Sequence, residues 1–426
     1  MAAEKVRLDY LVVARCVAHM RQGFVDCFRQ EQVSRQFATA LKSVLSKRHV
    51  SMKVVAKMDV VEFELECAAS KGSMVHHEGA LPSKGIIESS VHDRVRIPMG
   101  LGVLLRRLKN VWRKIFSLFK RIKSLIILDA SKLAHKILMR FAIIPEDVCV
   151  RRLEMKTDFQ DTSKLLLSVA PHVKELKLKG NFSIGYVASK QLWDTISTFP
   201  QLRHLNITSK SYSDFREYSC SRTDALSCLK VLKLKSFEAC GSGVYHLFDS
   251  AETILSTFQD NSNLRRLSLD VEAELLSSPL LLPILSNLHH LSIEKEIDSS
   301  LYPIAENHSL MSDIRFILQS LSDNAVLCLK VQLIGEEDED VEEMLNFVKN
   351  CLDLSNIAKK PIRLIFGNTD CPLLYLDVYG MVYLIAEQEW FRHEVDYKNL
   401  FEVERVGRTC VVSGSNAKVI ISVVNE

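Results

Sequence analysis

Basic side chains recur at alternate positions along several short apolar segments in the middle of this 426-residue chain. Side chains that alternate in this way would lie together on one face of a β-sheet, where cations can attract an acidic protein surface. An ordinary solvated sheet face is the alternative interpretation. The target-binding face predicted from this pattern comprises Arg152, Lys156, Lys177, Lys179, Lys233, Lys235 and Arg266.

Patterns that would carry bond chemistry are missing from the sequence. It has no Walker loop, no HExxH, no GxSxG and no kinase motif set. The 11 cysteines include no CxxC pair, and the histidine pairs at 76–77 and 289–290 have no matching carboxylate or cysteine pattern. We therefore expect no catalytic residues, no metal site and no cofactor, and we expect the cysteines to be reduced thiols.

The basic residues belong to a repeated hexad, in which an apolar residue, two variable residues, Leu, one variable residue and an apolar residue follow one another. The second position is Lys, Arg or His in every copy. The fourth and sixth positions have the spacing of a strand with one buried side. The seven copies begin at Ile122, Val150, Val173, Leu202, Leu229, Leu264 and Leu288.

Segments between the hexads have helical spacing of apolar residues. Two clear examples span 186–199 and 244–258, where apolar side chains recur every three or four residues. Each unit therefore consists of a short strand, a loop and a helix. One such unit cannot bury its apolar face alone, so neighbouring units must stack. The sequence predicts an α/β solenoid of parallel strands plus helices.

The hexads resemble the leucine-rich repeat, whose consensus is LxxLxLxxN/CxL. The resemblance covers roughly 122–296 and implies a leucine-rich-repeat solenoid that binds other proteins. Only Asn181 occupies the consensus asparagine position, so we expect irregular loops. Weaker copies that could extend the array begin at Val60, Val326 and Leu373.

The N-terminal region has no hexad and is predicted to form helices over 8–47. The stretch from Val33 to Leu45 resembles the closing half of an F-box, although the opening Leu-Pro of that family is absent and the nearest equivalent is Leu8-Asp9. The resemblance implies docking to the adaptor of a cullin-RING (SCF-type) ubiquitin ligase. A plain helical cap of the solenoid is the alternative. The residues that the resemblance assigns to the adaptor are Val33, Arg35, Phe37 and Leu41.

A basic amphipathic helix is predicted over 101–122. Apolar residues follow a spacing of three and four, and eight Lys or Arg side chains, the last of them Lys123 just beyond the range, fill the other side with no acid between them. Such a helix could bind an anionic membrane or calmodulin. Because it leads directly into the hexad at Ile122, packing on the solenoid with a solvated basic side fits its position better.

The chain divides into four predicted regions. Residues 1–50 form the small N-terminal helical unit, and 51–121 form an irregular segment with the basic helix. Residues 122–335 form the solenoid, and 336–426 form an irregular continuation that ends in a hairpin. An acidic run at 336–343 precedes a short apolar segment and is expected to begin a helix.

Bulk composition limits the classes of partner. The chain has 55 Lys and Arg against 52 Asp and Glu, a net charge of +3, so nucleic acid is not expected. No apolar stretch approaches the roughly 20 residues of a membrane span, and no signal peptide is evident. We expect a non-enzymatic protein of the cytoplasm or nucleus that serves as the substrate-recognition subunit of an SCF-type ligase. A leucine-rich-repeat scaffold or inhibitor-like binding protein is the alternative.

Overall fold

A computed structural model gives the fold of the chain, an α/β arrangement of mostly parallel strands with helices. Two compact units divide at Cys228, and the division falls inside helix α8. The structure describes residues 39, 43, 45–47, 49–56, 60–67, 91–98, 104–129, 138–140, 142–156, 162–180, 186–208, 221–240, 251–270, 282–298, 308–334, 347, 350–351, 353–367, 402–406, 409–413 and 418–424.

The first unit contains a sheet whose strands run in the order β3-β2-β1-β4-β5-β6-β7. Strands β1, β4, β5, β6 and β7 run parallel to one another, whereas β2 is antiparallel to both β1 and β3, so that β1, β2 and β3 form an antiparallel meander at one end. The bounds are β1 His49–Ala56, β2 Val60–Cys67, β3 Val91–Pro98, β4 Arg121–Asp129, β5 Cys149–Lys156, β6 Glu175–Lys179 and β7 His204–Thr208.

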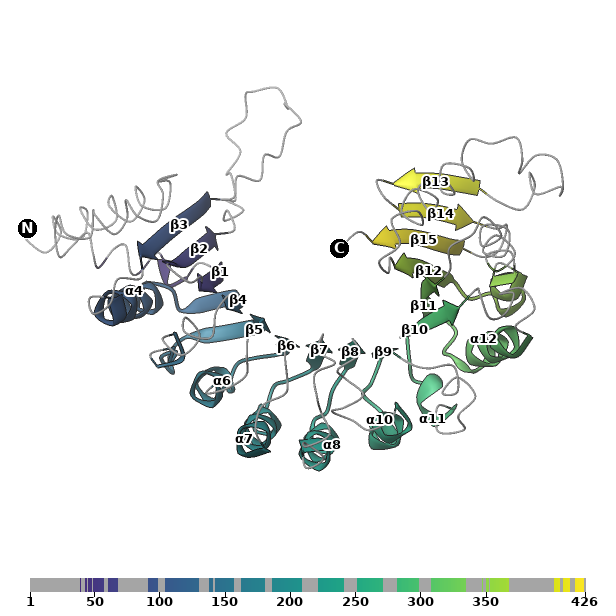
Figure 1. Ribbon diagram of the computed structural model, residues 1–426, viewed down its shortest axis with the longest axis horizontal. Helices are drawn as coiled ribbons and strands as arrows, with labels where there is room; N and C mark the ends of the chain where they lie inside the picture. The colour runs from purple at the N-terminus through teal and green to yellow at the C-terminus, as the bar shows by residue number, and fades with distance from the viewer. Residues whose placement is uncertain are drawn as a thin grey trace, which may run out of the picture. The chain divides into compact units, whose positions relative to one another are not determined.

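Helices of the first unit lie on one side of its strands (Figure 1). They are α4 Leu104–Leu118, α6 Ser163–Val169 and α7 Tyr186–Ser197, followed by α8 Ser221–Val231. The predicted helix over 186–199 is thus present as α7, and it buries Leu192, Trp193 and Ile196. Because the helices cover one side only, alternate strand residues on the other side are available for polar groups.

The second unit repeats this design in the strand order β8-β9-β10-β11-β12-β15-β14-β13. Its first six strands in that order are parallel, and β14 pairs antiparallel with both β15 and β13. The elements are β8 Ser236–Cys240, α10 Ala251–Phe258, β9 Arg266–Asp270, α11 Leu282–Leu285, β10 His290–Asp298, α12 His308–Ser320, β11 Val326–Ile334, β12 Ile362–Gly367, β13 Glu402–Val406, β14 Thr409–Ser413 and β15 Lys418–Val424.

The core of each unit is built from the apolar hexad positions. In the first unit the fourth-position residues Leu125, Leu153, Leu176 and Leu205 are aligned by register across β4 to β7. All four are at most 1% exposed. Because such a row is shielded from water by the helices, it supplies the apolar burial that holds neighbouring repeats together.

Backbone hydrogen bonds explain what the second hexad position does. The carbonyl of Lys174 accepts hydrogen bonds from the N–H groups of Arg203 and His204 at 2.9 and 3.0 Å. In the second unit the carbonyl of Arg265 accepts in the same way from His289 and His290, at 2.8 and 3.1 Å. The second hexad position therefore lies just before its strand, and its carbonyl forms the first hydrogen bonds to the strand of the next repeat.

At two places in the second unit, a side-chain donor binds a backbone carbonyl as the consensus asparagine of regular repeats would. The amide Nδ2 of Asn261 donates to the carbonyl of Leu234 at 3.2 Å, and the hydroxyl of Ser322 donates to the carbonyl of Leu288 at 2.5 Å. Leu288 is the first residue of its hexad, and Leu234 is the first residue of a hexad once the register of β8 with β9 is taken into account, as described below. Asn181, which matches the consensus asparagine, lies outside the described residues. The array thus satisfies equivalent carbonyls with different residue types, as its irregular sequence predicts.

The hexad predicted at Leu229 is wrong. Residues up to Val231 belong to α8, and the strand begins only at Ser236. Two periodicities overlap here, because Ala225, Cys228, Leu229 and Leu232 are all buried and follow the spacing of a helix. The register of β8 with β9 aligns Phe237 with Leu267, so the true copy begins at Leu234.

This correction moves two predicted site residues off the sheet. Lys233 and Lys235 are exposed but lie in the segment between α8 and β8, not on a strand. Lys235 instead occupies the second hexad position, since its carbonyl accepts from the N–H groups of Arg265 and Arg266 at 2.9 and 3.1 Å. Of the predicted residues Lys177, Lys179, Lys233 and Lys235, only the first two therefore lie on a strand, β6.

The flanking regions also differ from the prediction. The segment 51–121, expected to be irregular before its helix, holds most of β1 together with β2 and β3. The weak hexad at Val60 is a strand, but it runs antiparallel to β1 as part of a hairpin. The weak hexad at Val326 is β11, parallel to β10, and the two segments predicted to form a C-terminal hairpin are β14 and β15. The weak hexad at Leu373 lies outside the described residues.

Candidate functional site

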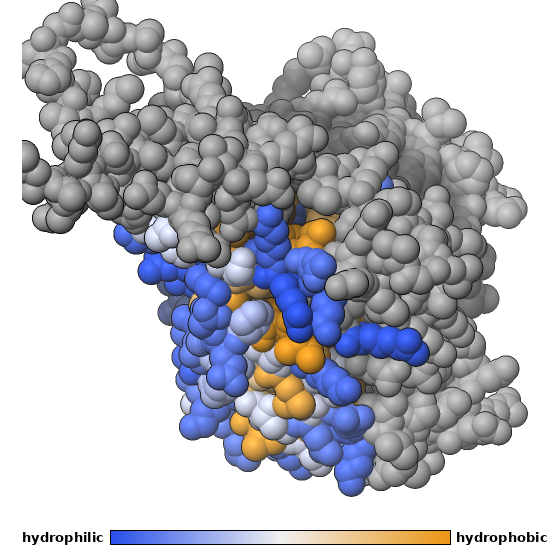
Figure 2. Space-filling model, turned by 90° about the vertical axis from the view of Figure 1, so that its left-hand side faces the viewer, coloured by the Kyte–Doolittle hydropathy of each residue, from blue (hydrophilic) through white to orange (hydrophobic). Residues whose placement is uncertain are grey.

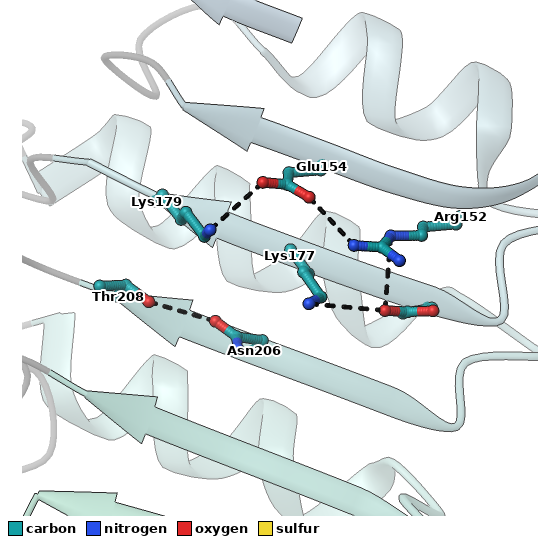
Figure 3. A network of polar contacts seen from close by, with 7 residues as sticks. Arg152, Glu154, Lys177, Lys179, Asn206 and Thr208 are labelled. Carbon is teal, nitrogen blue, oxygen red and sulfur yellow. Dashed lines mark hydrogen bonds and ion pairs between the residues drawn. The ribbon is translucent and has the colours of Figure 1, made fainter. Parts of the chain in front are cut away.

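A charged surface lies on strands β5, β6 and β7, on the side of the sheet away from the helices (Figure 3). We call it the β5–β7 face. It comprises the third and fifth positions of successive hexads and the residue that follows each hexad, all of which alternate with buried apolar residues. The residues of the β5–β7 face are Arg152, Glu154, Lys156, Glu175, Lys177, Lys179, His204, Asn206 and Thr208.

Glu154 is the centre of this face. One carboxylate oxygen lies 3.3 Å from Nζ of Lys179, and the other accepts a hydrogen bond from Nη2 of Arg152 at 3.2 Å. The side chain of Glu154 is only 14% exposed, so water screens these contacts incompletely. Burial raises the pKa of Glu154, but Lys179 and Arg152 together outweigh it and hold the pKa below its ordinary value of 4.5. Glu154 is therefore an anion at neutral pH that fixes two cations.

Glu175 adds one further cation, Lys177, to the same network and also contacts Arg152. Its Oε1 lies 3.5 Å from Nε of Arg152 and 3.8 Å from Nζ of Lys177. Nε of Arg152 is buried and has no hydrogen-bond partner of good geometry, so the 3.5 Å contact is an electrostatic one. Arg152 thus bridges the two carboxylates, and its guanidinium retains donor capacity that a further acceptor could use.

Lys156 stands apart from this network. It is exposed, and the register places it directly opposite Lys179, at a strand separation of about 4.8 Å. Within the described ranges no ion pair involves Lys156. Four cations (Arg152, Lys156, Lys177 and Lys179) thus face two anions, which leaves the β5–β7 face with a net charge of about +2. Of the two ammonium groups at its β5–β6 end, Lys179 is paired with Glu154 and Lys156 is not.

The β7 end of the face is polar and uncharged. Asn206 is 9% exposed, and its Oδ1 accepts a hydrogen bond from the hydroxyl of Thr208 at 3.2 Å. In register, Asn206 lies beside Lys177 and Thr208 lies beside Lys179. The cations are therefore bordered by hydrogen-bonding groups, a combination that can align an extended acidic segment.

The structure brings together four of the predicted target-binding residues, Arg152, Lys156, Lys177 and Lys179. Arg266 lies on β9 in the second unit, while Lys233 and Lys235 are not on a strand. Glu154 and Glu175 were not among the predicted site residues. Their alternation with leucine in the sequence nevertheless places them on the same side of the sheet as the predicted cations. The adaptor residues Val33, Arg35, Phe37 and Leu41 lie outside the described residues.

Helix α4 packs against the sheet as its position predicts. Trp112, Ile115 and Phe116 are at most 1% exposed, and the Trp112 indole N–H donates to the carbonyl of Ile143 at 3.0 Å. Lys109 and Arg113 remain exposed on the other side of the helix. Figure 2 shows the surface seen from the left of Figure 1, where the described residues are mostly hydrophilic with apolar residues between them. The apolar side of α4 is therefore used by the core.

The described part of the chain offers no metal-ligand cluster, no membrane-spanning helix and, among the cysteines whose side chains it describes, no disulfide. There, no cluster of three or more His, Cys, Asp or Glu side chains could hold a metal ion, and no helix is long and apolar enough to cross a membrane. Cys149, Cys228, Cys240, Cys328 and Cys351 are free thiols. No protein-family model matches the chain, and no curated protein resembles it closely enough to be aligned with significance.

Proposed function

We propose that this chain is a leucine-rich-repeat solenoid that binds an acidic protein target through the β5–β7 face. The repeated hexads, the parallel register and the helices on one side of the strands support that repeat type. The observation that carries the target class is the juxtaposition of Lys156 and Lys179, because only one of these two cations has a carboxylate partner among the described residues. An acidic side chain of a partner would complete the set.

Fixed cations suit this role better than mobile ones. Lys177, Lys179 and Arg152 are held by Glu154 and Glu175, so part of their side-chain entropy is lost before a partner arrives. Electrostatic complementarity of this kind speeds association and selects partners more than it raises affinity. Binding at the β5–β7 face should therefore weaken steeply as salt is raised.

A matched pair of variants tests the location of the target site. The variant K156E/K179E reverses two charges on the β5–β7 face, whereas K233E/K235E reverses two exposed charges away from the strands of that face. A fluorescent oligoglutamate peptide would serve as the defined acidic probe, with fluorescence anisotropy measured at low and moderate salt. We expect about tenfold weaker binding for the first variant only. Equal losses in both variants would mean that the probe senses net charge and that the β5–β7 face is not the site.

We further propose that the whole protein is a substrate-recognition subunit of a cullin-RING ubiquitin ligase. What supports it is the resemblance of 33–45 to the closing half of an F-box, placed before a repeat array. In this arrangement Val33, Arg35, Phe37 and Leu41 would contact the ligase adaptor, and the β5–β7 face would hold the target. The protein itself would perform no bond chemistry and would act in the cytoplasm or nucleus.

Co-purification with the ligase adaptor separates this role from that of a scaffold or inhibitor-like binding protein. We expect a stable complex with the full chain that is lost in V33D/F37D and retained in K156E/K179E. Circular dichroism would establish that each variant still folds. If the full chain forms no complex with the adaptor under any condition, the ligase role is excluded and the scaffold alternative stands, with the target site still testable by the oligoglutamate experiment.

A further inference from the structure

A separate group of cations lies in the second unit, on the sheet side that alternates with its buried leucines. Arg266 on β9 and His290 on β10 are direct neighbours in register. Arg363 on β12 aligns with Cys328 on β11, which aligns with Ser292 on β10. Arg363 therefore lies level with the residue two positions after His290, on the same side of the sheet. Both arginines are exposed and His290 is half-buried. The two arginines therefore come from strands on either side of β10 and share with His290 one side of the sheet.

Small side chains separate these long ones. Ser268, Ser292 and Cys328 occupy one row across β9, β10 and β11. Ser292 is only 4% exposed, and its hydroxyl is buried with no hydrogen-bond partner. These small side chains leave the sheet surface between Arg266 and Arg363 uncovered. The two arginines lie on strands about 14 Å apart, a distance that two long side chains reaching toward each other can span.

The charges around His290 concentrate positive potential there. Burial, followed by Arg266 and Arg363, lowers the pKa of His290 from its ordinary 6.5, and Glu238 on β8 opposes them. The register places the charged residues Asp270, Glu294 and Lys330 one row beyond, on β9, β10 and β11. The imidazole is therefore mostly neutral at neutral pH, and a bound anion would favour its protonation.

We propose that Arg266, His290 and Arg363 form a subsite for the phosphoryl group of a phosphorylated side chain on a protein partner. A phosphoryl group carries close to two negative charges and three acceptor oxygens, which matches two guanidiniums and an imidazole N–H presented by separate strands on one side of the sheet. A carboxylate has one charge and a planar pair of oxygens, which a single arginine satisfies. This subsite is independent of the β5–β7 face, because every residue in it belongs to the second unit.

Protonation of His290 makes binding depend on pH. As pH falls through the lowered pKa of His290, a third positive charge appears and anion affinity rises. Sulfate is a suitable first probe because it stays a dianion between pH 5.5 and 8, so any pH effect belongs to the protein. Binding would be followed by chemical shifts of the histidine ring in a histidine-labelled sample of the full chain.

Three variants define the expected result. R266M/R363M should weaken sulfate binding by about tenfold at every pH, because two charge-assisted contacts are lost. H290Q should retain the affinity seen at pH 8 but lose its increase at lower pH. The control R315M removes an exposed arginine of α12 and should bind as the wild type does. Equal weakening in R315M, or sulfate binding that R266M/R363M leaves unchanged, would overturn the subsite.

Peptides then identify the source of the anion. A random-sequence peptide library with central phosphoserine would be compared with matched serine and glutamate libraries and with inorganic phosphate. We expect the phosphoserine library to bind at least about tenfold more tightly than each of the others, and R266M/R363M to remove that preference. If the glutamate library or inorganic phosphate binds as tightly as the phosphoserine library, the assignment to a phosphorylated partner is wrong.

Discussion

Glu154 forms its ion pair diagonally, with Lys179 at 3.3 Å, although the residue directly opposite it on β6 is Lys177. Lys177 pairs instead with Glu175, its neighbour along the same strand side. Lys156 lies directly opposite Lys179. Because both carboxylates of the described network are occupied by other cations, Lys156 has no carboxylate partner there. The excess of cations makes the β5–β7 face positive, and the pairing pattern leaves Lys156 as the cation without a carboxylate.

Replacing the central carboxylate should cost stability. The variant E154Q removes the charge that contacts Lys179 and Arg152, and we expect a loss of about 1 kcal/mol in the free energy of unfolding, reduced from the full value of a buried pair by partial exposure. E146Q, which changes an exposed glutamate before β5, is the matched control and should have little effect. Urea unfolding followed by circular dichroism measures both.

The same variant predicts a pH dependence. The pKa of Glu154 is lower in the folded chain than its ordinary 4.5, so its contribution is fully present above pH 4.5 and declines as pH falls through the folded pKa. The stability gap between wild type and E154Q should therefore narrow below pH 4.5. A gap that widens on acidification would show that the carboxyl group is stabilised in its protonated form, contrary to the contacts observed.

Lys156 should be useful for binding and dispensable for folding. In K156M the repulsion with Lys179 disappears, so we expect thermal stability that is unchanged or slightly higher, with the difference largest at low salt. Binding of the oligoglutamate probe should nevertheless weaken several-fold. K179M should instead lower both stability and binding, because it leaves Glu154 with one cation. Loss of stability in K156M would indicate a structural role for its side chain.

The hexads predicted strand register over most of the array for a simple physical reason. Leucine at a fixed spacing on each strand must face the same core, so Leu153, Leu176 and Leu205 align without further information. The prediction failed at Leu229 because leucines there suit a helix and a strand equally, and burial of Ala225 and Cys228 on one helix side decided the outcome. The diagonal ion pair of Glu154 with Lys179 depends on the conformations of both side chains across two strands, and the spacing of residues in the sequence does not predict those conformations.

Buried Lys360 offers a separate test of how the second unit is held together. It is 8% exposed, and its ammonium group donates to the carbonyls of Leu318 and Leu321 at the end of α12, at 2.8 and 2.6 Å. K360M should destabilise the fold by about 2 kcal/mol, because two buried carbonyls lose their donor at the negative end of the helix. K359M, which changes the exposed neighbouring lysine, is the control.

Substitutions in and beside strand β8 test the corrected register most directly. Phe237 is fully buried and contacts the ring of Phe258 at a centroid distance of 5.1 Å, whereas Val231 is 65% exposed. We expect F237A to lower the free energy of unfolding by about 3–5 kcal/mol through lost burial and a residual cavity, and V231A to change it by less than about 0.5 kcal/mol. In the hexad beginning at Leu229, neither residue would be a core position. Urea unfolding of the two variants decides between the registers, because only a strand that begins at Ser236 points Phe237 into the core.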